Sequence, residues 1–179
     1  MNKPYNQNST ALVKSINRDI AIFSTEVINS NIDYVVVNSF GEERKKFHEF
    51  SDREIEIDAN HYFDVVDASM INKNTYAIDL GCGTGRWTKY MKDRVGFMEA
   101  IDPSDAIFTA DKLIGPADNI RLAKASLDNI PFDDETFDFA MSIGVLHPIP
   151  DPQQPMLYCF KTVNIGGAFY AYFFFYQGY

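Results

Sequence analysis

Cysteine is scarce in this sequence, and it has no long hydrophobic run. The two cysteines, Cys82 and Cys159, are too far apart for a disulfide framework or a zinc-ligand spacing, so a reducing cytoplasm is the expected location. The longest apolar run, Ala168 to Tyr176, is too short to cross a bilayer. The first ten residues are polar and lack the apolar centre of a signal peptide. We therefore expect a cytoplasmic protein with no membrane span.

The sequence also has few positively charged residues. The sequence has 16 Lys and Arg against 25 Asp and Glu, a net charge of −9, so no nucleic-acid partner is expected. Lys and Arg are absent from Ala125 to Phe160, a stretch with six acidic residues. This stretch has two interpretations, a solvated acidic face or the rim of a cleft that suits a neutral or cationic ligand.

From Thr75 onward, β-rich runs alternate with helical stretches. Strands are predicted at Thr75–Leu80, Phe97–Ile101, Asn119–Ala125, Phe137–Ile143 and about Ala168–Phe175. Helices are predicted to begin near Arg86, Pro103 and Asp151, and Gly166-Gly167 is expected to break the chain before the last strand. Such alternation predicts βαβ units, hence an α/β fold with a doubly wound, mostly parallel sheet.

The N-terminal part has a different pattern. Apolar residues recur at helical spacing, which predicts a helix from Ser9 to about Ile28. The run Ile32–Val37 fits either a strand or a continued helix, and the charged run Gly41–Phe50 is predicted to be helical. Ser51 and Glu54 have the form of a capping box, whose helix is expected to extend to about Ser69. We therefore expect an N-terminal helical segment ahead of the sheet.

The ends of the predicted strands carry the functional signal. In an open parallel sheet, ligands bind beyond the carboxyl ends of the strands. Four of these ends are polar or contain glycine, namely Asp79–Gly85, Asp102, Ser126–Asp128 and Ile143–His147. We expect them to meet along one edge and to form a binding site there.

A glycine loop follows the first of these strands. Gly81, Gly83 and Gly85 leave no side chain between the backbone and a ligand. A dinucleotide fingerprint would need a small residue where Arg86 stands, which disfavours a nicotinamide oxidoreductase, and a phosphate-binding P-loop would need a Gly-Lys-Ser/Thr run that is absent. The carboxylate of Asp79 would oppose a pyrophosphate but suit an ammonium group. These features favour a phosphate-free cofactor with an amino-acid arm.

Asp102 ends the second predicted strand, ahead of Pro103. A carboxylate there can accept hydrogen bonds from both hydroxyls of a ribose. Its alternative interpretation is an acidic residue at a helix N-terminus. Combined with the glycine loop, the ribose role is favoured.

Several motifs now occur together in one order. The run Tyr76 to Trp87 (YAIDLGCGTGRW) resembles the first motif of class I S-adenosylmethionine-dependent methyltransferases, and Glu99 to Ser104 (EAIDPS) resembles their second. Later motifs are similar in Ala125–Phe132, Phe137–Asp138, Gly144–His147 and Val163–Gly167. The likeness is to the small-molecule and quinone branch, which implies a Rossmann-like fold, S-adenosylmethionine as cofactor and a small-molecule methyl acceptor.

The resemblance also implies residue roles. The backbone of Gly81, Cys82, Gly83 and Gly85 would pack against the cofactor, with Asp79 near its methionine amine. Asp102 would hold the ribose. The remaining cofactor-binding positions would be Pro103, Ser104, Ser126, Leu127 and Asp128 beside the adenine, and Ile143, Gly144 and Val145 on the methionine side. Ser126 replaces an Asp that many relatives have there.

The resemblance leaves the reaction partly open. Methyl transfer needs a base only when the acceptor is protonated and weakly acidic, and His147 is the candidate for this role, with a structural role as the alternative. By analogy with similar enzymes, residues 1–72 would fold over the site as a lid, and 73–179 would form the cofactor-binding domain.

One departure from the family concerns the last strands. The family sheet has seven strands, whereas this one is expected to stop after its fifth, at Ala168–Phe175. The chain would then be a fragment, or a partner subunit would cover that edge. A catalytically idle, S-adenosylmethionine-binding or scaffold subunit is therefore the alternative function.

Overall fold

The computed structural model describes residues 3–23, 50–146 and 151–173. Its elements, in chain order, are β1 (Ala11–Lys14), β2 (Asp19–Ile22), α2 (Asp52–Tyr62), β3 (Tyr76–Leu80), α3 (Arg86–Met91), β4 (Phe97–Asp102), α4 (Ala106–Ile114), β5 (Ile120–Lys124), the 3₁₀ turn η1 (Leu127–Asn129), β6 (Phe137–Ile143), α5 (Gln153–Lys161) and β7 (Val163–Tyr172). The run Ile32–Val37, and all of the predicted helix Gly41–Phe50 except Phe50, lie outside the described residues. No helix within the described ranges is long and apolar enough to cross a membrane.

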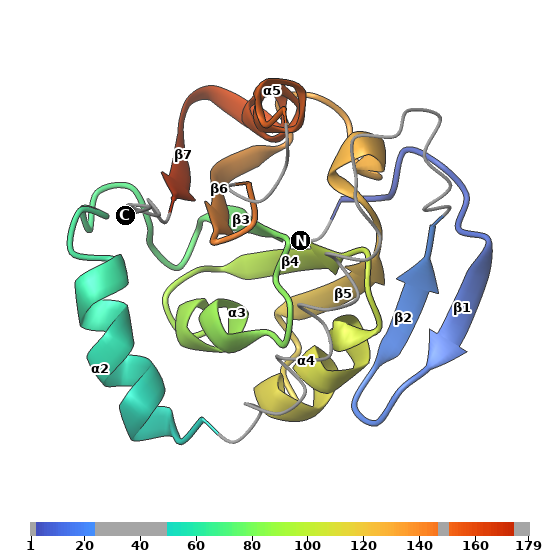
Figure 1. Ribbon diagram of the computed structural model, residues 1–179, viewed down its shortest axis with the longest axis horizontal. Helices are drawn as coiled ribbons and strands as arrows, with labels where there is room; N and C mark the ends of the chain where they lie inside the picture. Colours follow the sequence, from blue (N-terminus) through green and yellow to red (C-terminus); the bar gives the residue numbers. More distant parts are fainter. Residues whose placement is uncertain (1–2, 24–49, 147–150, 174–179) are drawn as a thin grey trace, which may run out of the picture.

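The strands form one sheet in the order β1-β2-β5-β4-β3-β6-β7 (Figure 1). All neighbouring pairs are parallel except the hairpin of β1 and β2. The predicted α/β fold with a mostly parallel sheet is confirmed. The expectation of a sheet that ends at five strands is wrong, because the N-terminal hairpin adds two strands beside β5. β7 pairs with β6 alone among the described strands, at the opposite edge.

The hairpin also corrects the helix expected from Ser9 to about Ile28, of which residues 9–23 are described. Ile20 and Phe23 are buried, but Ile16 lies in the turn and is 74% exposed, so the helical spacing is a coincidence of two short strands and their turn. Contacts with a residue distant in the sequence stabilise the turn. The Arg18 guanidinium donates to Asp111 Oδ1 at 2.8 Å, and the Asn17 backbone amide donates to Asp111 Oδ2 at 2.9 Å. Asp111 is fully buried in α4.

The capping box at Ser51 is confirmed: its hydroxyl accepts from the Glu54 amide, and the Glu54 carboxylate accepts from the Ser51 amide at 2.8 Å. The helix ends at Tyr62 rather than near Ser69. β-Branched Val65 and Val66, which have lower helix propensity, lie just beyond its end. Gly166 and Gly167 do not precede the last strand but lie within β7, beside an irregular register with β6.

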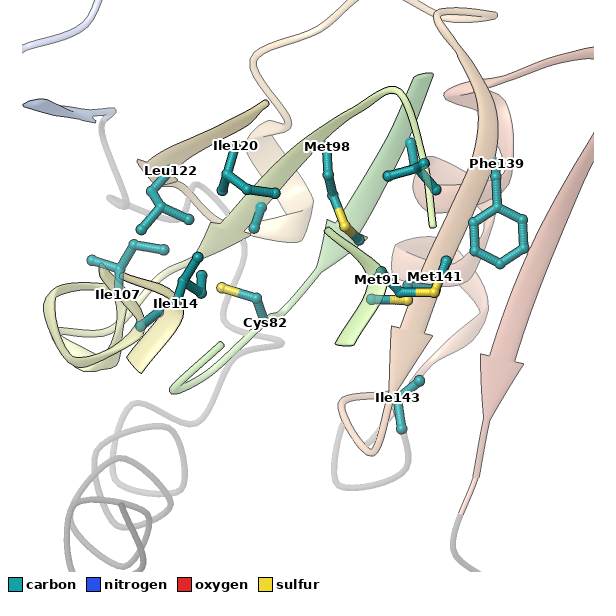
Figure 2. Close-up of a cluster of buried hydrophobic side chains, with 14 of the residues drawn as sticks. Cys82, Met91, Met98, Ile107, Ile114, Ile120, Leu122, Phe139, Met141 and Ile143 are labelled. Carbon is teal, nitrogen blue, oxygen red and sulfur yellow. The ribbon is translucent and has the colours of Figure 1, made fainter. Parts of the chain in front are cut away.

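Two apolar clusters cover the two faces of the sheet, as expected for parallel strands buried on both sides. The first joins α2, α3 and α4 to one face and includes Ala59. Figure 2 labels further members of this cluster, among them Met91, Met98, Ile107, Ile114 and Phe139. The second joins η1 and α5 to the other face and includes Ile78, Leu127, Phe132, Phe137, Ala140 and Cys159. The sheet is thus the middle layer of three. Because both of its faces are covered, a ligand has access to it only at the ends of the strands.

Candidate cofactor site at the carboxyl edge of the sheet

The register of the parallel strands brings the predicted site segments to one edge. Leu80 at the end of β3 lies beside Ile101 of β4, and Asp102 at the end of β4 lies beside Lys124 of β5. On the other side of β3, Asp79 lies beside Met141 near the end of β6. The segments after these four strands therefore begin at the same edge, where Asp79–Gly85, Asp102, Ser126–Asp128 and Ile143–Val145 were expected to meet.

The glycine loop between β3 and α3 has a left-handed backbone at all three glycines. Gly81, Gly83 and Gly85 have φ of 86°, 55° and 81°. The amides of Gly81 and Cys82 both donate to the Ile101 carbonyl at 2.9 Å, which fixes the start of the loop to the neighbouring strand. This geometry explains why the positions are glycine, since side chains with a Cβ rarely adopt such φ values.

Packing within the protein adds a second reason at two of the glycines. A Cβ on Gly81 would lie 2.6 Å from Val145 Cγ2, and a Cβ on Gly85 would lie 2.8 Å from the Cβ of Ala110 in α4. These two glycines allow the loop to approach the segment after β6 and the helix after β4. The sequence pattern alone assigned all three glycines to the ligand, which overlooks this structural requirement.

Asp102 connects the glycine loop to the next helix. Its Oδ2 accepts from the Gly83 amide at 2.8 Å, while its Oδ1 accepts from the amide and the hydroxyl of Ser104 at 2.9 and 2.5 Å. Its side chain is 6% exposed. Each carboxylate oxygen has two lone pairs, so these bonds leave capacity for a further donor. Pro103 lies between Asp102 and Ser104 at the start of the segment that leads into α4.

Asp79 lies beneath the loop at the end of β3. It is 2% exposed, and the Thr88 hydroxyl of α3 donates to its Oδ2 at 2.6 Å. Sequence reasoning did not single out Thr88. The available signal was its position three residues after Gly85, on the first turn of a helix that must pack on the sheet.

The turn after β5 is closed by its own polar groups. The Ser126 hydroxyl accepts from the Asp128 amide at 3.1 Å, and the Ser126 carbonyl accepts from the Asn129 amide at 3.1 Å. Leu127 is buried in the second cluster, whereas Asp128 is exposed. Of the predicted residues here, Asp128 therefore presents its side chain outward.

The end of β6 and the segment after it are bonded to the two neighbouring strands. The Ser142 hydroxyl donates to the Leu80 carbonyl at 2.9 Å, and the Gly144 amide donates to the Tyr172 carbonyl at 3.0 Å. Gly144 also has a positive φ, of 69°. His147, the candidate base, lies outside the described residues.

Three predicted site residues turn their side chains into the core. Cys82 and Ile143 belong to the cluster in Figure 2, where the Cys82 side chain points toward Ile114 of α4. Leu127 belongs to the opposite cluster. Their side chains pack inside these apolar clusters, so only their backbone atoms are in a position to meet a ligand at the edge.

The comparison with protein families decides the wider identity. Residues 78–171, more than half of the chain, match the model of the methyltransferase domain family. The chain belongs to this family. The resemblance to class I S-adenosylmethionine-dependent methyltransferases is thereby confirmed, and with it the cofactor that the motifs implied.

Individual relatives of the methyltransferase domain agree with this assignment. The chain is 29% identical over 108 residues to a demethylmenaquinone methyltransferase of Staphylococcus epidermidis, covering 58% of this chain and 44% of that protein. It is 25% identical over 149 residues to a ubiquinone biosynthesis O-methyltransferase of Pseudomonas fluorescens, covering 77% and 62%. The matches therefore span about half of the curated relatives' length.

A solved structure shows the same fold. An S-adenosylmethionine-dependent methyltransferase from Mesorhizobium loti superimposes with a TM-score of 0.53 at 21% identity, covering 62% of this chain and 50% of that chain. At this identity the likeness supports the sheet and its helices, not the substrate.

The helix α2 packs onto the methyltransferase domain close to the same edge. The Tyr62 ring lies between the rings of Trp87 in α3 and Tyr172 in β7, with centroids 4.6 and 4.7 Å away. Figure 1 shows the end of α2 next to the end of β7. Because the Tyr172 carbonyl accepts from Gly144, the end of α2 is close to the segment after β6.

Ion pairs hold the rest of α2 to α3. Lys89 Nζ lies 2.6 Å from Asp52 Oδ1, and Arg86 pairs with Asp58. The Arg86 guanidinium also lies 4.3 Å from the Trp87 ring centroid. Burial lowers the pKa of Arg86, against a smaller opposing effect of Glu54. Arg86, whose bulk argued against a dinucleotide at the sequence level, thus has a structural role in seating α2.

Proposed function

We propose that this chain binds S-adenosylmethionine across the carboxyl edge of its sheet and transfers the methyl group to a small-molecule acceptor. The observation that carries the proposal is the link from the glycine loop to Asp102, in which the Gly83 amide donates to the carboxylate at 2.8 Å. This link sets a side-chain-free backbone beside a carboxylate at one strand edge, within the stretch that matches the family.

The chemistry of the edge suits this cofactor better than a phosphate-bearing one. The acidic groups of the segments, Asp79, Asp102 and Asp128, would repel a pyrophosphate, and no Lys or Arg occurs from Ala125 to Phe160. In our assignment Asp79 lies nearest the methionine amine, and Asp102 accepts from the ribose hydroxyls. The backbones of Gly81, Cys82, Gly83 and Gly85 form the floor.

The remaining predicted contacts follow the same order along the edge. In this proposal Pro103, Ser104, Ser126, Leu127 and Asp128 border the adenine, and Ile143, Gly144 and Val145 border the methionine arm. The bound cofactor supplies an electrophilic methyl group on a sulfonium. The chain's own groups hold the reactants in line and exclude water. His147 stays a predicted base.

A small-molecule acceptor is supported by the named substrates of the quinone-pathway relatives and by the net charge of −9. The predicted cover, residues 1–72, finds support only in its described part around α2. Residues 11–22 instead belong to the sheet. We propose that Tyr62 borders the acceptor side of the site, next to Tyr172 and the segment after β6. A partner subunit at the β7 edge and a cytoplasmic location remain predictions.

Calorimetry with S-adenosylhomocysteine tests the proposal. We expect Gly83→Ala to weaken binding at least tenfold, about 1.4 kcal/mol, because its methyl would occupy the space of the ligand. Gly166→Ala is the control. Gly166 also has a positive φ, of 87°, with nothing within 4 Å of its Cβ position, so this variant reproduces backbone strain away from the site. It should bind as the wild type does.

Two outcomes would refute the proposal. One is equal affinity of the wild type and Gly83→Ala for S-adenosylhomocysteine. The other is micromolar binding of NADH without binding of S-adenosylhomocysteine, which would indicate a nicotinamide site instead.

A further inference from the structure

Three residues near the N-terminus pack on the turn that follows β5. The Gln7 amide group donates to Asn129 Oδ1 at 2.9 Å, and the Asn6 backbone amide donates to the Pro131 carbonyl at 3.2 Å. The Tyr5 ring lies 5.3 Å from the Phe132 ring, centroid to centroid. These contacts join parts of the chain more than 120 residues apart, so they are a feature of the tertiary structure.

The other end of this tail is anchored near the starts of the strands. The Lys3 ammonium donates to the Thr136 carbonyl at 2.8 Å, and the Lys3 carbonyl accepts from the Arg121 guanidinium at 2.6 Å. Arg121 is itself fixed by two hydrogen bonds to Glu99, of 2.7 and 2.8 Å, and Glu99 is 1% exposed. Residues 3–7 therefore form a strap, fixed to the sheet at Lys3 and to the turn at Gln7.

The turn itself is too short to define its own position. η1 has three residues, and a single 3₁₀ turn gains little from its own hydrogen bonds. Its orientation must come from packing, which includes contacts with α5 and with the strap. Asn129, which accepts from Gln7, directly follows Asp128, the outward-facing residue of the turn.

We propose that the strap is part of the cofactor site: Tyr5 and Gln7 are positioning residues that hold the turn 126–132 in the orientation needed at the adenine. This inference depends on the proposed function, since it assumes that the turn borders the adenine. The strap lies outside the stretch that matches the family, residues 78–171, so it would be a device of this chain's own N-terminal segment.

The test uses the full chain and measures the Kd of S-adenosylhomocysteine by calorimetry. We expect Gln7→Ala to raise the Kd about 2- to 10-fold, the range for loss of one neutral hydrogen bond if the whole loss reaches the ligand. Tyr5→Leu should act in the same direction, whereas Tyr5→Phe should not, because the Tyr5 hydroxyl has no hydrogen-bond partner among the described residues.

A double-mutant cycle separates positioning from general destabilisation. If Gln7 acts through Asn129, Gln7→Ala should have no further effect on the Kd in an Asn129→Ala background. Arg18→Ala at the hairpin tip is the stability control, since it breaks a buried pair far from this turn. It should lower the midpoint of urea unfolding without changing the Kd. Hydrogen exchange of the amides of residues 127–130 and 132 should accelerate in Gln7→Ala but not in Arg18→Ala.

The outcomes distinguish this inference from the proposed function. An unchanged Kd in Gln7→Ala and Tyr5→Leu, with tight binding by the wild type, would overturn the inference alone. An equal rise of the Kd in Arg18→Ala would also overturn it, because the effect would then follow stability. Failure of the wild type to bind S-adenosylhomocysteine would refute the proposed function and this inference together.

Discussion

Replacement of Asp111 by alanine should destabilise the fold by about 3–5 kcal/mol, the usual cost of removing one partner from a buried ion pair. Asp111 is fully buried, and the Arg18 side chain beside it is 11% exposed. The substitution would leave the Arg18 guanidinium without its anion and the Asn17 amide without its acceptor. Urea unfolding at neutral pH measures the loss, with an unchanged slope as the check that compactness is preserved.

The pH dependence gives an independent check. Burial would raise the pKa of Asp111, but hydrogen bonds from the Asn17 amide and from the Ser15 and Arg18 side chains outweigh it and lower the pKa. A carboxylate with a lowered folded-state pKa stabilises the fold fully above its unfolded-state pKa of about 3.9 and loses this contribution as the pH falls through the folded-state value. The stability difference between wild type and Asp111→Asn should therefore shrink below about pH 4.

The matched control is Glu56→Ala, which breaks the surface pair with Arg94, whose N–O distance is 3.0 Å. This pair should contribute less than about 1 kcal/mol because both groups are hydrated. If Asp111→Ala cost no more stability than this control, or if the effect of Asp111→Asn were the same at all pH values, the argument for a buried electrostatic anchor would be wrong.

Three further predictions concern the edge and its surroundings. Asp102→Ala should weaken S-adenosylhomocysteine binding by about 1–3 kcal/mol in calorimetry, and an unchanged affinity would remove Asp102 from the site. The Cys159 side chain is 0% exposed, and this burial raises the pKa of its thiol to about 12. Iodoacetamide should therefore label Cys159 only after unfolding, and labelling of the native chain would contradict this. Trp87 is the only tryptophan, so Tyr62→Ala should shift its emission to longer wavelength by admitting water; an unshifted spectrum would mean that α2 does not shield it.

The central part of the fold was predictable from the sequence because its signals are local. The run before Gly81 is apolar and β-rich, and the helices begin or end at residues with clear capping or breaking chemistry, such as Ser51 and Gly115. The positions of Asp79 and Asp102 at strand ends then followed from the common edge of a parallel sheet. The motifs indicated the family because they consist of the residues at the ends of successive strands, which follow one another at a fixed spacing in the sequence.

The N-terminal hairpin was not predictable in this way. Its strands have four residues each, and exposed Leu12 and Ile16 fall at helical spacing by chance. What favours the hairpin is a partner distant in the sequence, the buried carboxylate of Asp111, and no local pattern contains that contact. The packing requirement for glycine at positions 81 and 85 was missed for a similar reason. The side chains that a Cβ would meet there, Val145 and Ala110, come from other segments of the chain.

The carboxylate of Asp102 has a consequence for how affinity can be interpreted. Its Oδ2 accepts from the Gly83 amide in the left-handed stretch, and its Oδ1 accepts from Ser104 at the entry to α4. If this loop holds the cofactor as proposed, these hydrogen bonds within the protein already fix its backbone, which lowers the entropy cost of ordering it on binding. In the proposed site, a substitution at Asp102 would remove a ligand contact and also loosen the loop. Comparing the heat-capacity change of binding between Asp102→Asn and wild type would separate the two contributions.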